Sequence, residues 1–222
     1  KKSPTLYGLS AMNGYSCGNT QNFHTKAYHQ LLDCPIMFAK PDTTSFKLGP
    51  TKVTIGVFSE SGRELSEDIY EQVRLSMGAI ESFLHGNLPV DRYAFIFYIK
   101  DYSEFEGLVE GTEIKIGTIV KALRELIGQG FGALEHGNSS VYYLPDFGND
   151  MVLDQMANVC IHEFFHILTP LGLHSEEIGN FNYIDPQMSK RLWLYEGITE
   201  YFAGISQVKG GVITRDEYIR SV

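Results

Sequence analysis

Residues 162–166 read His-Glu-Phe-Phe-His, and this short run decides both the local fold and the chemistry expected of the chain. In an α-helix, residues four apart lie on one face, so His162 and His166 project together. Glu163 lies about 100° around the helix, next to the imidazoles but not in line with them. Two histidines at this spacing bind one Zn²⁺, and the carboxylate between them serves as a general base. The run therefore predicts a zinc hydrolase of the metalloprotease type.

The residues around this run favour a buried helix. Ile161, Phe164, Phe165 and Leu168 follow the i, i+3, i+4, i+7 pattern on the face away from the histidines, and Pro170 ends the segment. The alternative is that two core histidines fall at this spacing by chance, because short motifs have false positives.

A third ligand is needed, because a catalytic zinc site uses three protein ligands and leaves a position for water. Residues 192–203, LWLYEGITEYFA, read as a second amphipathic and mostly buried helix. Glu196 and Glu200 share one face of it. Carboxylates in so apolar a segment are costly unless they are paired or bound to a cation, so Glu196 is the expected third ligand. Glu200 would then accept the free ring N–H of one of the two ligating histidines.

The alternative for Glu196 and Glu200 is a solvated helix face with Lys190 and Arg191 nearby. Gly197, beside the expected ligand, costs a helix about 1 kcal/mol relative to alanine. Its position suggests that another helix approaches closely there.

Composition excludes several classes of protein. The 222-residue chain is 43% hydrophobic and 20% charged, which suits a globular protein with one sizeable core or two small lobes. A formal net charge of −9, with no basic cluster, argues against a nucleic-acid surface. No apolar stretch approaches the roughly 18 residues that would span a bilayer. We expect a soluble protein or fragment whose partner is a peptide substrate.

The three cysteines do not form a disulfide scaffold or a zinc ribbon. Cys160 is expected to be a small core residue beside the metal helix. Cys17 and Cys34 would bridge in an exported protein and remain thiols otherwise, and the sequence leaves both outcomes open.

The order of elements predicts an α+β fold. Residues 1–50 read as the end of a preceding β-rich domain or a segment of strands and loops, residues 51–149 as an α/β sheet lobe, and residues 150–222 as a helical zinc-binding lobe. The sheet lobe packs on the helical lobe in this prediction, and zinc lies in the cleft between them. The expected strands are residues 53–58, 93–99 and 141–144, and the expected helices of the sheet lobe are residues 66–84 and 116–127.

Several segments, in order along the chain, resemble the glycyl aminopeptidase family of thermolysin-like zinc metallopeptidases, the gluzincins. They cover about residues 31–205. The segments are Leu32-Asp33-Cys34-Pro35-Ile36, Leu88-Pro89-Val90-Asp91-Arg92-Tyr93, Gly132-Ala133-Leu134-Glu135-His136, residues 162–166, Ile178-Gly179-Asn180-Phe181-Asn182-Tyr183 and Leu192-Trp193-Leu194-Tyr195-Glu196-Gly197.

This resemblance implies a thermolysin-like catalytic domain with one Zn²⁺ per chain. It also gives Glu135 a role that spacing alone does not. In related zinc aminopeptidases, a Gly-x-x-Glu segment lies on an edge strand, pairs with the substrate backbone and offers its carboxylate to the free α-amine. Glu135 is therefore an expected amine-binding residue, with His136 as a neighbour in the substrate site. Without the resemblance, Glu135 would read as a surface residue in a glycine-rich turn.

The chain departs from the family in two places. Residues 167–174 read ILTPLGLH where the family carries a basic stretch, and no tyrosine is assigned as oxyanion donor because Tyr195 and Tyr201 read as packing residues. The leading interpretation is an aminopeptidase that removes small N-terminal residues, glycine or alanine, with Glu163 as general base. The alternatives are a thermolysin-like endopeptidase and a catalytically silent zinc or peptide-binding module.

The ends of the chain favour a fragment or processed form. It begins at Lys1 without an apolar signal segment and stops at Val222 in what reads as the start of a further helix. We therefore expect further domains of the same chain to be missing. The composition suits a periplasmic or cell-envelope peptidase, and a cytoplasmic one stays open.

Overall fold

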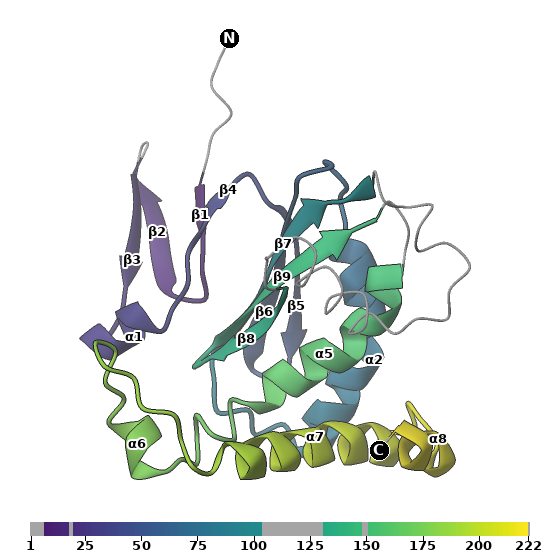
Figure 1. Cartoon of the computed structure of the whole chain (residues 1–222). Helices are drawn as coiled ribbons and strands as arrows, with labels where there is room; N and C mark the ends of the chain where they lie inside the picture. The colour runs from purple at the N-terminus through teal and green to yellow at the C-terminus, as the bar shows by residue number, and fades with distance from the viewer. Residues whose placement is uncertain (1–6, 18–19, 104–130, 148–150, 222) are drawn as a thin grey trace.

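The computed structural model describes residues 7–17, 20–103, 131–147 and 151–221 (Figure 1). Its main sheet has five strands in the order β5-β6-β7-β9-β8. The central pairs β6-β7 and β7-β9 are parallel, and the outer pairs are antiparallel, so the sheet is mixed as the α+β prediction requires. The strands are β5 (Asp42–Leu48), β6 (Thr51–Ser59), β7 (Arg92–Asp101), β8 (Gly132–His136) and β9 (Ser139–Asp146).

The N-terminal part of the chain forms two small strand pairs beside this sheet (Figure 1). They are β1 (Tyr7–Leu9) with β4 (Met37–Ala39), and β2 (Asn13–Cys17) with β3 (Thr20–His24), and α1 (Tyr28–Leu32) lies between β3 and β4 in the chain. Because β5 precedes residue 50 and pairs with β6, the main sheet includes a strand from the first predicted segment.

Besides α1, the described helices are α2 (Ser66–Phe83), α5 (Met151–Phe165), α6 (Glu176–Gly179), α7 (Leu192–Lys209) and α8 (Arg215–Ser221). The helix predicted from Ser66 is α2, and the two helices predicted to carry metal ligands are α5 and α7. The helix predicted at residues 116–127 lies outside the described residues. After the sheet, the described chain is helical, as predicted.

Alternation along the strands produces a layered structure. On β7, Tyr93, Phe95 and Phe97 face the helices and join the large core, whereas Ala94 and Ile96 face the N-terminal strands. Helix α2 contacts β5 and β6, and α5 contacts β8 and β9, so the two helices cover the same face of the sheet. Helix α5 is therefore held between the sheet and α7, which crosses below it in Figure 1.

Helix α7 is more exposed than its apolar sequence predicts. Trp193 is 74% exposed and Tyr201 is 52% exposed, whereas Tyr195 and Ala203 are buried against the rest of the protein. The expected close approach at Gly197 is wrong, because a Cβ added there would meet nothing within 4 Å. The helix approaches a neighbour at Gly204 instead, where an added Cβ would lie 2.1 Å from the Tyr218 ring.

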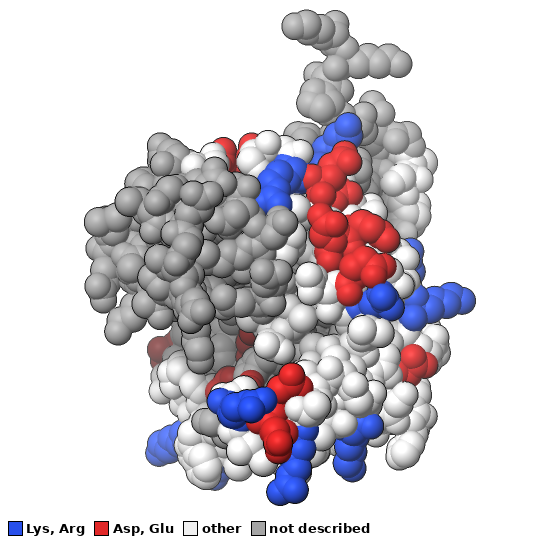
Figure 2. Space-filling view, turned by 90° about the vertical axis from the view of Figure 1, so that its right-hand side faces the viewer, with Lys and Arg blue, Asp and Glu red and all other residues white. Residues whose placement is uncertain are grey.

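The three cysteines are free thiols: Cys17 is exposed, Cys34 is half-buried and Cys160 is fully buried within α5. In the part of the chain that the structure describes, no helix has the length and apolarity needed to cross a bilayer. Figure 2 shows Asp and Glu side chains gathered in a band on one face, with Lys and Arg side chains mostly standing singly around it. That face therefore offers no extended basic surface among the described residues.

Replacing Phe164 should test the packing between α5 and the sheet. Its ring is fully buried and lies 4.7 Å from that of Tyr93, centroid to centroid. We expect Phe164→Ala to lower the free energy of unfolding by about 3–5 kcal/mol, because it leaves a cavity in the core. Urea unfolding followed by far-UV circular dichroism measures this loss. Phe38→Ala, at a ring that is 72% exposed, is the control and should change stability little. Superimposable curves for both variants would contradict this packing.

Candidate metal centre and substrate strand

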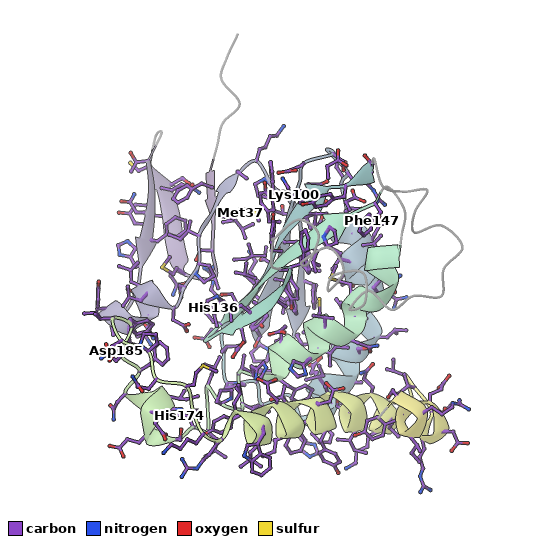
Figure 3. All side chains as sticks on the ribbon, in the orientation of Figure 1. Met37, Lys100, His136, Phe147, His174 and Asp185 are labelled. Carbon is purple, nitrogen blue, oxygen red and sulfur yellow. The ribbon has the colours of Figure 1, made fainter. Side chains whose placement is uncertain are left out.

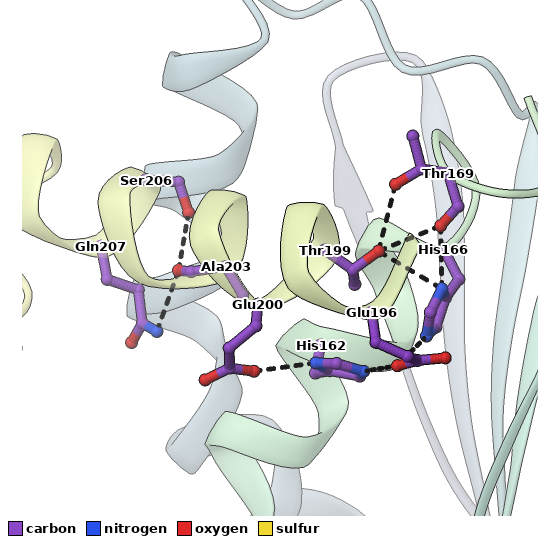
Figure 4. A network of polar contacts seen from close by, with 9 residues as sticks. All are labelled: His162, His166, Thr169, Glu196, Thr199, Glu200, Ala203, Ser206 and Gln207. Atoms are coloured by element: carbon purple, nitrogen blue, oxygen red, sulfur yellow. Dashed lines mark hydrogen bonds and ion pairs between the residues drawn. The ribbon is translucent and has the colours of Figure 1, made fainter. Parts of the chain in front are cut away.

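Three predicted ligands converge where α5 and α7 meet (Figure 4). Nε2 of His162 lies 3.1 Å from Oε2 of Glu196, and Nε2 of His166 lies 3.6 Å from the same oxygen. A ligand atom of each of the three residues lies within 4.8 Å of the others. Helix α5 ends at Phe165, so His166 stands in the turn that follows while keeping its place beside His162.

The second nitrogen of His162 has a partner on α7. Nδ1 lies 2.9 Å from Oε2 of Glu200, so the carboxylate one turn beyond Glu196 serves His162 rather than His166. The spacing of the two glutamates predicts that Glu200 holds a histidine, and the structure identifies which one. The side chain of Glu200 is 68% exposed, so solvent reaches this contact.

The second nitrogen of His166 is held by groups that the sequence did not reveal. Nδ1 lies 2.8 Å from the backbone oxygen of Thr169, and the Thr199 hydroxyl donates to that same oxygen at 3.0 Å. Thr169 stands in the turn after α5, and Thr199 lies on the buried face of α7. A backbone carbonyl leaves no sequence signal, and a helical threonine is too common to identify, so this contact was missed.

These contacts fit a zinc ion. An oxygen acceptor at Nδ1 of each histidine favours a proton on that nitrogen, which leaves the lone pair of Nε2 facing Glu196. Two imidazole lone pairs and a carboxylate oxygen at such short range repel one another unless a cation lies between them or a histidine is protonated. Two histidines and one glutamate are also a donor set that zinc peptidases use.

Glu163 is buried next to the two histidines, and its carboxylate is incompletely paired. Oε2 has no hydrogen-bond partner among the residues that the structure describes. Burial raises the pKa of Glu163 to about 7, and the nearby carboxylate of Glu135 is the second cause. A buried polar atom without a partner is uncommon and indicates a missing ligand or water at this point.

Three buried hydroxyl groups connect the sheet to the backbone of α5 at Glu163. The Tyr93 hydroxyl donates to Oγ of Ser140 at 3.0 Å and lies 3.4 Å from the backbone oxygen of Glu163. Ser140 also contacts the Tyr142 hydroxyl at 2.8 Å. These contacts with the sheet therefore fix the position of α5 at Glu163.

Glu135 lies on β8, the edge strand of the main sheet, and its neighbour on the ladder is Ser140 of β9. Side chains two apart share one face of a strand, so Glu135 points to the same side as Ala133, which packs on the helical core. One ligand atom of Glu135 lies within 4.8 Å of those of Glu163 and His166. The resemblance to known peptidases led us to expect an edge strand here, and the structure has one.

His136 points to the other face of β8. Its Nδ1 lies 3.0 Å from Oδ1 of Asp33, which follows α1. Figure 3 shows His136 at the end of the sheet nearest the N-terminal strands. The structure therefore places His136 beside the N-terminal segment rather than within the cluster formed by Glu135, Glu163 and His166.

A pocket of about 680 Å³ adjoins Glu135, on the side of the N-terminal segment. This volume is in the range of small-molecule sites. Residues from the N-terminal strands, from the turn after β8 and from the loop around α6 line it, among them His24, Asp33, Arg92, Glu135, Asn138, Leu171, His174 and Tyr183.

Two comparisons with known proteins bear on this fold and on the candidate metal centre. Residues 155–222 match the M61 glycyl aminopeptidase family. The chain also resembles the crystal structure of an aminopeptidase N family protein from Idiomarina loihiensis, with a TM-score of 0.68 and 18% identity. That match covers 97% of this chain and 34% of the other, so the chain spans about a third of the length of that protein. No curated protein matches the chain.

These comparisons confirm the resemblance to the glycyl aminopeptidase family and the aminopeptidase-like α+β fold.

Glu200 gives the first test of the metal centre. We expect Glu200→Gln to weaken Zn²⁺ binding about 10- to 100-fold, because the amide orients His162 less strongly than a carboxylate does. Competition with a chromogenic chelator measures the affinity. Glu64→Gln, at an exposed site on the loop before α2, is the matched control and should bind zinc as the unaltered chain does. Equal affinity in all three proteins would show that Glu200 does not support the metal.

Proposed function

We propose that the chain carries the catalytic centre of a zinc-dependent aminopeptidase that removes small N-terminal residues, glycine or alanine. The observation that carries this proposal is the convergence of two histidine Nε2 atoms on Oε2 of Glu196, with a free buried carboxylate oxygen of Glu163 beside them. The match to the glycyl aminopeptidase family supports cleavage at the N-terminus of the substrate and a preference for small residues there.

In this proposal His162, His166 and Glu196 hold the zinc. When bound, zinc supplies a Lewis acid for the scissile carbonyl and lowers the pKa of a water in the open fourth position. Glu200 and the carbonyl of Thr169 keep the two imidazoles turned so that Nε2 of each faces inward.

Glu163 is the general base of the proposed reaction. Its carboxylate takes a proton from the attacking water and then passes that proton to the leaving amine. Burial raises the pKa of Glu163 and so favours the acceptance of a proton by its carboxylate. The backbone of Glu163 is fixed by contact with Tyr93, so its side chain starts from a defined position.

Glu135 binds the α-amine in this proposal. Two carboxylates close together repel each other, and a cationic amine between Glu135 and Glu163 would relieve that repulsion. Among the described strands, β8 pairs with β9 alone, so its other side is where an extended peptide would pair. The amine and the backbone of a substrate would thus be held by the same short strand.

Glu163→Gln is the direct test of the general base. We expect this variant to keep about one zinc per chain and to lose activity on Gly- and Ala-p-nitroanilide about 10²- to 10⁴-fold, because the amide cannot take the proton. Plasma mass spectrometry and anilide turnover measure the two effects. Glu196→Ala provides the contrast, since it should lose the metal itself. Full activity in Glu163→Gln would exclude its role as base, and zinc-free unaltered protein would exclude the metal centre.

Glu135→Ala separates the aminopeptidase from the endopeptidase. We expect it to lower kcat/KM for peptides with a free N-terminus about 10- to 100-fold, because a hydrogen bond between charged groups is lost. Cleavage of the same peptides after N-acetylation should change little. An equal loss on both substrates would favour a thermolysin-like endopeptidase. Zinc binding without turnover of any peptide would favour a silent binding module.

A further inference from the structure

The turn that connects β8 and β9 is held by a carboxylate from a distant part of the chain. Asp33 follows α1, and its backbone N–H donates to the carbonyl of His29 at 2.9 Å. Its side chain spans to the turn, where Oδ1 lies 3.0 Å from Nδ1 of His136 and Oδ2 accepts from the Gly137 N–H at 2.7 Å. Both carboxylate oxygens are therefore used on two successive residues.

Gly137 is shaped for this contact. A Cβ added at Gly137 would lie 2.9 Å from Oδ2 of Asp33, closer than carbon and oxygen atoms normally approach. The φ angle of Gly137 is outside the left-handed region, and the Asp33 carboxylate is the one group within 4 Å of the added Cβ. Beside it, the Cys34 thiol donates to Oδ1 of Asn138 at 3.4 Å. Burial, followed by the charge of Asp33, raises the pKa of Cys34 to about 11, so the thiol keeps its proton.

This contact lies directly after Glu135. In the part of the chain that the structure describes, β8 pairs with β9 alone, and the end of such a short edge strand frays unless another contact holds it. A ligand atom of Glu135 lies within 4.8 Å of one of Glu163, and two ionised carboxylates at this range repel each other. A restraint is therefore needed to keep Glu135 in place before a cationic amine arrives.

We propose that Asp33 is a positioning residue for amine binding: by holding His136 and Gly137, it fixes the end of β8 so that the Glu135 carboxylate faces Glu163. Asp33 touches no reacting atom and acts through the strand. This inference rests on the proposed function, in which Glu135 binds the α-amine of the substrate.

The test compares Asp33→Asn and Gly137→Ala with the unaltered chain and with Asp216→Asn. Asp216 is exposed on α8, away from the site, and serves as the matched control. The amide in Asp33→Asn keeps one acceptor and loses the other. The methyl group in Gly137→Ala pushes the carboxylate away while leaving Asp33 itself intact.

We expect both variants to lower kcat/KM for free N-terminal peptides about tenfold, mainly through a higher KM, because a small displacement of a binding group is costly. Cleavage of N-acetylated peptides, zinc content and melting temperature should stay near those of the unaltered chain. Hydrogen exchange at the Gly137 amide should become faster in both variants. Asp216→Asn should match the unaltered chain in every measurement.

Unchanged KM and unchanged exchange at Gly137 in Asp33→Asn would overturn the proposal, and so would an equal loss on free and acetylated peptides. Failure of the proposed function looks different, because the unaltered chain itself would then fail to prefer a free N-terminus. In that case, faster exchange in the variants would show a purely structural contact and would also overturn a role in amine binding.

Discussion

The position of α5 is the constraint on which the rest of the site depends. Phe164 packs against Tyr93 and Phe95 of the sheet, and the ring of Phe165 stacks on that of Phe202 of α7. This packing directs the two histidines toward α7. The polar contact between Tyr93 and the backbone of Glu163 then fixes the helix along its axis. A core that is closely packed does not deform continuously, so ligand geometry is set by the same contacts that stabilise the domain.

The two faces of the sheet pack against different parts of the chain. The helical face carries the candidate metal ligands and the carboxylates of Glu135 and Glu163, and the opposite face carries the N-terminal strands. Strand β8 contributes to both faces because consecutive side chains of a strand point to opposite sides of the sheet. Glu135 therefore lies beside the candidate metal centre, while His136 contacts Asp33 on the opposite face. In the proposal, the contact of Asp33 on one face positions the Glu135 carboxylate on the other.

The candidate site could be predicted from the sequence where residues of suitable chemistry recur at helical spacing. His162, His166 and Glu196 could be predicted to converge because helical spacing fixes which residues share a face, and the structure brings their ligand atoms together. Strands β6, β7 and β9 of the main sheet were predicted from their apolar runs. Glu135 needed a family resemblance, since a glutamate in a glycine-rich segment has no periodic signal. Contacts between distant segments could not be predicted: Thr169 acts through its backbone, and Asp33 lies about a hundred residues from its partners. The expected close approach at Gly197 failed because that face of α7 is exposed.

The exposure of Trp193 has a practical consequence for spectroscopy. It is the only tryptophan in the chain, it is 74% exposed, and it stands one helical turn before Glu196. An indole in water emits at long wavelength whether or not the core is folded, so its fluorescence reports poorly on global unfolding. Its emission is sensitive instead to events at the start of α7, which makes a single native fluorophore a local probe of ion loading and ligand arrival.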